Sequence, residues 1–133
     1  ITNVSNKLPK LNSDHDIVSL NIPFSGSHEA YWDNGLLRES GEIKEGLKDG
    51  LWRSYFENGI LFEVGFYKEG RANGHWKIYY PDGQLSADLH YRDDKLDGYC
   101  EYFHQDGSTE EVVLYSLDEP LKTLWTQQTD RCH

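Results

Sequence analysis

Residues 50–83 read GLWRSYFENGILFEVGFYKEGRANGHWKIYYPDG, and this stretch contains two copies of one pattern. Each copy has a glycine, a tryptophan two residues later, a pair of aromatic residues, and then Asn-Gly or Asp-Gly. Such a dipeptide between aromatic-rich flanks is the strongest short-range signal for a β-hairpin, because both residue types tolerate positive φ. The stretch therefore predicts two consecutive hairpins, each closed by a two-residue type I′ turn.

The same dipeptide recurs every 24 residues along the chain. It stands at Asn34-Gly35, Asn58-Gly59, Asp82-Gly83 and Asp106-Gly107. A fixed period of roughly 20–50 residues is typical of repeat architectures. We expect an all-β fold, a single-sheet meander of four stacked 24-residue β-hairpin repeats at residues 26–115. Residues 1–15 would form a polar N-terminal tail, residues 16–25 an edge or capping strand, and residues 116–133 a short C-terminal cap.

The C-terminal cap has two interpretations. Its apolar residues recur at helical spacing, at Leu117, Leu121, Leu124 and Trp125. With Asp118 as N-cap and Pro120 in the first turn, this pattern favours a short amphipathic helix. A last strand is the alternative.

A two-residue turn would also fix which residues face each other across each hairpin. In the second repeat Trp52 then faces Gly65 and Tyr55 faces Phe62. An aromatic ring that covers a cross-strand glycine restores packing that the missing side chain would forfeit. In the third repeat the same rule places His75 opposite His90.

The charge of the chain indicates the kind of partner. Net charge is −10, and residues 93–119 contain nine acids against one base, Lys95. Nucleic acids and anionic membranes are bound through Lys and Arg, so nucleic acid is excluded and membrane association is unfavoured, though it stays open. A basic protein partner remains, and so does the alternative of a solvated acidic face that only keeps the chain dissolved.

We therefore expect a protein-binding module, with two sets of partner-binding residues. The steering acids would be Asp93, Asp94, Asp97, Glu101, Glu110 and Glu111. The exposed aromatic contacts would be Trp52, Tyr67, Trp76 and Tyr91. Charges of this kind speed association, and desolvated Trp and Tyr rings supply much of the binding energy.

Catalytic and metal-site motifs are missing from the sequence. There is no HExxH, CxxC, EF-hand loop or Gly-rich phosphate loop between a strand and a helix. We expect no enzymatic activity, no cofactor and no metal. The His75/His90 pair, with Asp88 or Glu101 nearby, is the one constellation that suggests a metal, ligand or hydrolytic site. A coincidental cross-strand pair is the favoured interpretation, since a metal site normally needs three or four protein ligands.

The two cysteines, Cys100 and Cys132, fit a single disulfide that would pin the C-terminal cap to the fourth repeat. Disulfides persist in oxidising compartments. This pairing favours a periplasmic or secreted protein, with a cytoplasmic location as the alternative.

The two central repeats resemble the MORN-type repeat, in its bacterial antitoxin-like variant. The second repeat carries the motif at Gly50, Trp52, Tyr55, Phe56, Asn58, Gly59, Leu61 and Tyr67. The third carries it at Gly74, Trp76, Tyr79, Tyr80, Asp82, Gly83, Leu85 and Tyr91. The first and fourth replace the tryptophan by His28 and Cys100.

This resemblance implies a hairpin scaffold that binds proteins and, in some members, membranes. The function that it implies is that of an antitoxin or immunity protein that neutralises a partner. An envelope structural or membrane-associated scaffold, which could assemble edge to edge, is the alternative.

Overall fold

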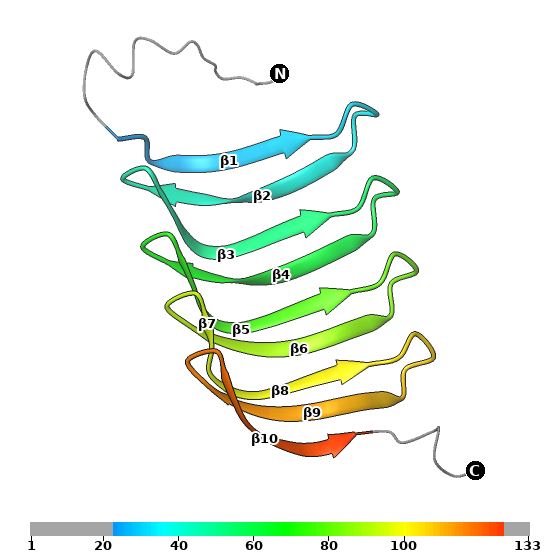
Figure 1. Cartoon of the computed structure of the whole chain (residues 1–133). Helices are drawn as coiled ribbons and strands as arrows, with labels where there is room; N and C mark the ends of the chain where they lie inside the picture. Colours follow the sequence, from blue (N-terminus) through cyan, green and yellow to red (C-terminus); the bar gives the residue numbers. More distant parts are fainter. Residues whose placement is uncertain (1–22, 127–133) are drawn as a thin grey trace.

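The computed structural model describes residues 23–126 and shows one open antiparallel sheet. Its strands are β1 (Gly26–Tyr31), β2 (Leu37–Lys44), β3 (Leu47–Tyr55), β4 (Leu61–Lys68), β5 (Arg71–Tyr79), β6 (Leu85–Arg92), β7 (Lys95–Leu96), β8 (Gly98–Phe103), β9 (Thr109–Ser116) and β10 (Glu119–Thr126). Their order in the sheet is the order of the chain, with the two-residue β7 pairing only β6 (Figure 1). The all-β meander of hairpin repeats is therefore confirmed. No helix long and apolar enough to cross a membrane occurs among the described residues.

Two expectations concern the ends of the chain. The predicted tail at 1–15, and the predicted edge strand at 16–25 as far as residue 22, lie outside the described residues. Pro23–Ser25 are not in a strand, so β1 is the first strand of the described sheet. At the other end the favoured helix is wrong, because Glu119–Thr126 pair with β9 as strand β10.

The physical reason lies in the turn before β10. Leu117 and Asp118 have φ values of 46° and 73°, which close a tight β9–β10 turn instead of starting a helix. The Asp118 carboxylate accepts a hydrogen bond from the Leu96 backbone N–H at 2.6 Å, so it fastens this turn to the previous repeat. Pairing with β9 satisfies backbone groups that an isolated short helix would have left unpaired on that edge.

The Asx-Gly turns lie together at one end of the sheet and differ from the expected type (Figure 1). Only the glycines have positive φ, for example 90° at Gly59, whereas Asn58 does not. The Phe56 N–H donates to the Ile60 carbonyl at 2.8 Å, and the Gly59 N–H donates to the Phe56 carbonyl at 3.0 Å. This is a three-residue loop, a type I turn followed by a left-handed glycine, and the two-residue type I′ prediction is wrong.

The extra loop residue changes the pairing only beside the loop. Tyr55 pairs with Leu61 instead of Phe62, because a β-bulge intervenes. Beyond the bulge the register is as predicted. Trp52 pairs with Gly65, and His75 pairs with His90.

The true type I′ turns are the links between repeats, at the opposite end of the sheet. Both central residues have positive φ in each of them, as at Glu69 (51°) and Gly70 (83°). The third link has Asp94 where the earlier links have glycine, and its carboxylate accepts a hydrogen bond from the Ala72 N–H at 2.7 Å. An aspartate here gains a bond to the preceding repeat that glycine could not make.

Leu117→Asn is expected to stabilise the protein by about 1 kcal/mol, because asparagine adopts the left-handed conformation at lower cost than leucine. The Leu117 side chain is 48% exposed, so little buried apolar area is lost. Urea unfolding of the two proteins measures the difference. Leu121→Asn, in extended backbone and 60% exposed, is the matched control and should not stabilise. A lower free energy of unfolding for Leu117→Asn would contradict the strain argument.

The core lies on one face of the sheet and is built from rings laid over small residues. The indoles of Trp52 and Trp76 are 3% and 4% exposed. The Trp52 ring covers Gly41, and the Trp76 ring covers Gly65 so closely that an added Cβ would lie 2.0 Å from the indole. The expectation that Trp52 covers its partner Gly65 is therefore wrong in one respect: each ring covers the glycine of the preceding hairpin.

In the next repeat the sizes are exchanged. Cys100, fully buried, takes the tryptophan position, and Leu89 takes the glycine position. Both belong to the same core cluster. The small Cys100 with the larger Leu89 therefore fills the space that tryptophan with glycine fills in the earlier repeats. Burial also raises the pKa of the Cys100 thiol. The proposed partner of Cys100 in a disulfide, Cys132, lies outside the described residues.

Candidate functional site

The four aromatic residues predicted to contact a partner form a continuous row inside the ring-covered face. Trp52 meets Tyr67 edge-on at 6.2 Å between centroids, Tyr67 meets Trp76 at 5.2 Å, and Trp76 meets Tyr91 at 5.9 Å. Burial raises the pKa of both tyrosine phenols. The expectation that both tryptophans are exposed is wrong, because their rings are buried over Gly41 and Gly65. Tyr67 and Tyr91 are half-buried and keep part of their surface accessible.

The six predicted steering acids do not form one patch. Asp93 and Asp94 lie in the β6–β7 link, and Asp97 follows β7, where its carboxylate accepts a hydrogen bond from the Leu117 N–H at 3.1 Å. Glu101 lies on β8, and its carboxylate accepts a hydrogen bond from the Thr109 hydroxyl at 2.8 Å. The remaining two, Glu110 and Glu111, are consecutive residues of β9, so strand alternation directs them to opposite faces.

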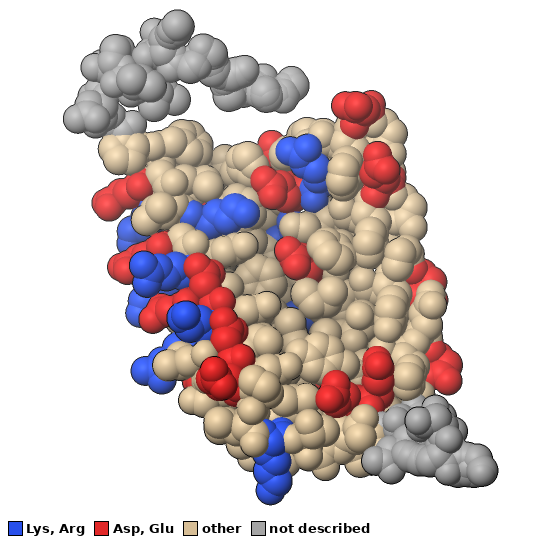
Figure 2. Space-filling model, viewed as in Figure 1, with Lys and Arg blue, Asp and Glu red and all other residues tan. Residues whose placement is uncertain are grey.

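The link end of the sheet carries both signs of charge (Figure 2). An open hollow of about 620 Å³ lies there. Its lining residues are Glu45, Leu47, Lys68, Glu69, Arg71, Asn73, Arg92 and Asp93. Interspersed Lys and Arg offset the local field of Asp93. Among the predicted acids, Glu110 and Glu111 lie farthest along the chain from these cations.

Glu63 is a half-buried carboxylate on the ring-covered face. Burial raises the pKa of Glu63 above its ordinary value of 4.5, the charge of Lys48 opposes that shift, and Glu39 adds to it. Lys48 itself lies over two rings, with its Nζ 4.6 Å from the centroid of Trp52 and 5.0 Å from that of Tyr67. The two residues place a partly desolvated acid and a ring-bound cation side by side.

Glu63→Gln is expected to raise the free energy of unfolding at pH 7. Because the pKa of this acid is higher in the folded state, its ionised form opposes folding, and the penalty disappears as pH falls through the raised pKa toward 4.5. Thermal unfolding from pH 4 to pH 8 should show a gain that fades at the acid end. Glu110→Gln, at an exposed position, is the control. An equal gain at every pH would contradict the burial argument.

Strand β10 is exposed at every residue and carries three large apolar side chains, a surface that sequence reasoning missed. Leu121 is 60% exposed, Leu124 40% and Trp125 46%. β10 is the last strand of the sheet, so among the described residues the outward side of its backbone has no neighbouring strand. We call Leu121, Leu124 and Trp125 the β10 edge. The helical spacing of these residues concealed it, because the same residues on a helix would have pointed toward the core.

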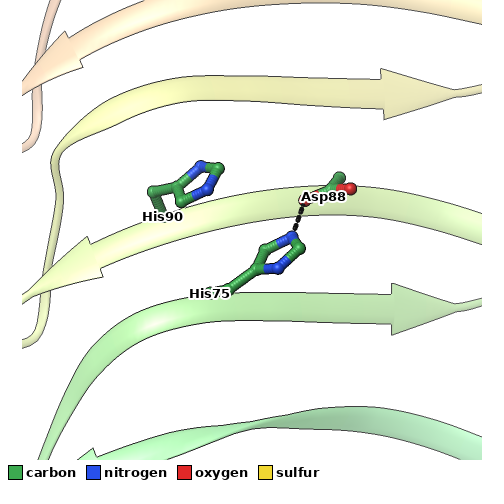
Figure 3. A group of neighbouring side chains, drawn as sticks. All are labelled: His75, Asp88 and His90. Atoms are coloured by element: carbon green, nitrogen blue, oxygen red, sulfur yellow. Dashed lines mark hydrogen bonds and ion pairs between the residues drawn. The ribbon is translucent and has the colours of Figure 1, made fainter.

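The predicted histidine pair is present on the opposite face of the sheet. The rings of His75 and His90 stack at 4.8 Å between centroids, with 4° between their planes. Asp88 lies on the same strand as His90, two residues earlier, and its carboxylate contacts His75 (Figure 3). Glu101 and Tyr99 line the same shallow hollow.

Comparison with known families agrees with the geometry. A family model described as a MORN repeat variant matches residues 48–69 and 72–93, which span β3 with β4 and β5 with β6. A comparison with curated proteins found no match. MORN repeats commonly mediate binding to proteins or membranes. The hairpin period, the tryptophan-over-glycine core and the two matches together identify the chain as a MORN-type repeat protein.

Proposed function

We propose that this chain is a non-enzymatic protein-binding module of the antitoxin or immunity type, which neutralises a partner by binding it at the β10 edge. The observation that carries the proposal is the exposure of Leu121, Leu124 and Trp125 on a terminal strand. An exposed, apolar edge strand is a template for pairing with another chain, and native proteins generally blunt such an edge. Here the edge is retained, which supports a role in recognition.

The binding mode that suits this surface is strand addition. A partner segment that pairs with the free side of β10 gains backbone hydrogen bonds, while side chains of β10 give specificity. Trp125 pairs with Val112 of β9, and the next residue, Thr126, pairs with Glu111. Glu110, two residues before Val112, is therefore the acid on the same face as Trp125, and Glu111 lies on the other face. A partner with basic residues flanking an apolar strand fits this arrangement.

The acids determine how fast the partner arrives. Net charge is −10, so a basic partner is attracted at low ionic strength. Charges at the rim of an interface act mainly on the association rate and its salt dependence. We expect the double substitution Glu110→Lys with Glu111→Lys to slow association and to flatten the salt dependence. Unchanged kinetics would overturn the steering part of the proposal.

The experiment that tests the binding surface uses three immobilised proteins and a lysate of cells that naturally produce this chain. Wild type should retain one protein in stoichiometric amount. A Leu124→Ser, Trp125→Ser double variant should lose at least tenfold of it. Tyr31→Ser, at the opposite edge and 48% exposed, is the matched control and should bind as wild type does. Equal retention by all three would show that the β10 edge is not the surface.

Neutralisation needs a separate test. The retained protein is expressed alone in a bacterial host, and then together with wild type or with the Leu124→Ser, Trp125→Ser variant. Growth arrest that wild type relieves and the edge variant does not would support the antitoxin assignment. A retained protein that is harmless on its own would leave a binding module of another kind.

A second candidate function is an assembling scaffold, and a specific observation favours it. The described sheet has two open ends, β1 and β10, so copies could join edge to edge into a longer sheet. Light scattering during size-exclusion chromatography at rising protein concentration distinguishes the two functions. Growth of the mass with concentration, abolished by Tyr31→Ser as well as by the β10 variant, would favour the scaffold. A constant monomer mass would favour the partner-binding function.

A further inference from the structure

Three side chains with metal-binding atoms meet on the face opposite the tryptophans. The ligand atoms of His75, Asp88 and His90 all lie within 4.8 Å of one another. We propose that these residues form a binding site for a divalent transition metal of the zinc type. Figure 3 shows that they come from two adjacent strands, β5 and β6.

The backbone register places the three residues together. His75 and His90 are direct partners across the β5–β6 ladder, and Asp88 is partnered by Lys77. Asp88 and His90 are two residues apart on one strand, so alternation directs both to the same face. The pairing is fixed by the hairpin and buried residues of the other face. The site is therefore held by the rigid part of the sheet and not by a loop.

One of the two histidines has its tautomer fixed in the state that a metal requires. The Nδ1 of His90 lies 2.7 Å from the backbone carbonyl of Tyr99. A carbonyl oxygen can only accept a hydrogen bond, so Nδ1 carries the proton and donates it. The lone pair of neutral His90 is therefore on Nε2. Metal-binding histidines almost always have such an outer partner on the other ring nitrogen.

The second histidine is already bonded to the third ligand. The Nε2 of His75 contacts the Oδ1 of Asp88, with a proton between the two atoms. A cation that binds here takes the place of that proton, which moves to Nδ1 of the neutral imidazole or, from the imidazolium, to water. Zn²⁺ is coordinated by imidazole nitrogen and carboxylate oxygen in many protein sites.

A modest side-chain rearrangement completes the site. The lone pairs of an imidazole lie in the plane of its ring, and the two rings are stacked almost parallel, so their lone pairs do not converge. His90 is held by its hydrogen bond to the Tyr99 carbonyl, whereas the His75 side chain is 45% exposed, so it is the His75 ring that turns about χ2 to meet the ion. The hollow in front of them has a volume of about 240 Å³, enough for the ion and a bound water.

Glu101 lies beside the site but outside the group of ligand atoms within 4.8 Å of one another. It is the direct partner of Asp88 on β8 and lines the same hollow. One of its carboxylate oxygens accepts a hydrogen bond from Thr109, so Glu101 would have to turn toward the ion to serve as a fourth ligand. Two imidazoles with carboxylates suit zinc, copper or nickel, whereas Mg²⁺ and Ca²⁺ prefer ligand sets made only of oxygen.

The chain contains its own control for this site. His28 and Glu39 form a second histidine–carboxylate pair, with Nε2 and Oε2 2.9 Å apart and a comparable exposure of 36% and 27%. The ring of His28 stacks on Trp52 and not on another histidine. This pair has the chemistry of an ion pair without the second imidazole, so it distinguishes a metal site from an ordinary histidine–carboxylate contact.

The test is titration of the full chain with ZnCl₂ by isothermal calorimetry. We expect one zinc site whose affinity falls at least tenfold in His75→Gln and in His90→Gln, and changes less than twofold in His28→Gln. MgCl₂ should give no binding. Zinc affinity that survives both substitutions, or that falls equally in His28→Gln, would overturn the proposal.

A second measurement on the wild type does not depend on the folding of any variant. Long-range ¹H–¹⁵N spectra of the imidazoles report which ring nitrogen is altered by zinc. The expected result is a shift of the His90 Nε2 resonance and of one His75 nitrogen, with that of His28 unchanged. Zinc that leaves both His75 and His90 unchanged would exclude the site.

Discussion

Gly65→Ala is expected to destabilise the protein by roughly 3 kcal/mol, or to prevent folding, because the new methyl group has no space. A Cβ built at Gly65 lies 2.0 Å from the indole of Trp76. The indole is 4% exposed, and Tyr67 and Tyr91 contact it from either side, so it cannot swing away. Equilibrium unfolding in urea, followed by tryptophan fluorescence and far-UV circular dichroism, measures the loss.

Two further variants separate the steric cause from a general glycine effect. Gly83 has a φ of 95°, and no atom of the described residues would lie within 4 Å of a Cβ at this position. Gly83→Ala therefore suffers backbone strain alone and should cost about 1–2 kcal/mol. The double variant Gly65→Ala with Trp76→Ala removes the ring that the methyl group strikes. Its loss should be smaller than the sum of the two single losses, and simple additivity would contradict the collision.

Trp76→Ala is expected to cost about 3–5 kcal/mol, the range for removing a large aromatic residue from a core. The change uncovers Gly65, removes two edge-to-face ring contacts, and deletes the hydrogen bond from the indole N–H to the Phe66 carbonyl at 3.1 Å. The midpoint of urea unfolding gives the loss. Trp125→Ala is the matched control.

Trp125 is 46% exposed on β10, and its replacement should cost less than about 1 kcal/mol. Similar losses for the two tryptophans would show that the buried row of rings does not hold the sheet together. A small loss at position 76 alone would mean that neighbouring rings collapse into the space.

Much of the fold was predictable because a few residue types recur at the same positions of each 24-residue repeat. The glycines at one period and the tryptophans between them predict hairpin positions, register and the covered face. The type of turn was not predictable from Asn-Gly alone. Both the two-residue and the three-residue loop accept a glycine at positive φ, and they differ by one residue of register next to the loop.

The candidate site was less accessible to sequence reasoning. Trp52 and Trp76 suggested contact residues because exposed tryptophans often bind partners, but glycines at 41 and 65 make them the core. The acids are close together in sequence, yet a meander distributes consecutive residues over two faces and two ends. Only the pairing of His75 with His90 followed directly from the register, because it depends on strand geometry alone.

The strand order has a consequence for the history of the molecule. Each hairpin of the sheet contacts the ones directly before and after it in the chain, and no strand among residues 23–126 closes the sheet on itself. A gene segment that encodes one unit could therefore be duplicated or deleted in frame, provided that each tryptophan still covers a glycine of the preceding hairpin. Length is then a variable that selection can adjust in steps of one hairpin. An inserted copy of residues 47–70 is expected to fold in place, because its tryptophan would cover Gly65 and Trp76 would cover the glycine of the copy.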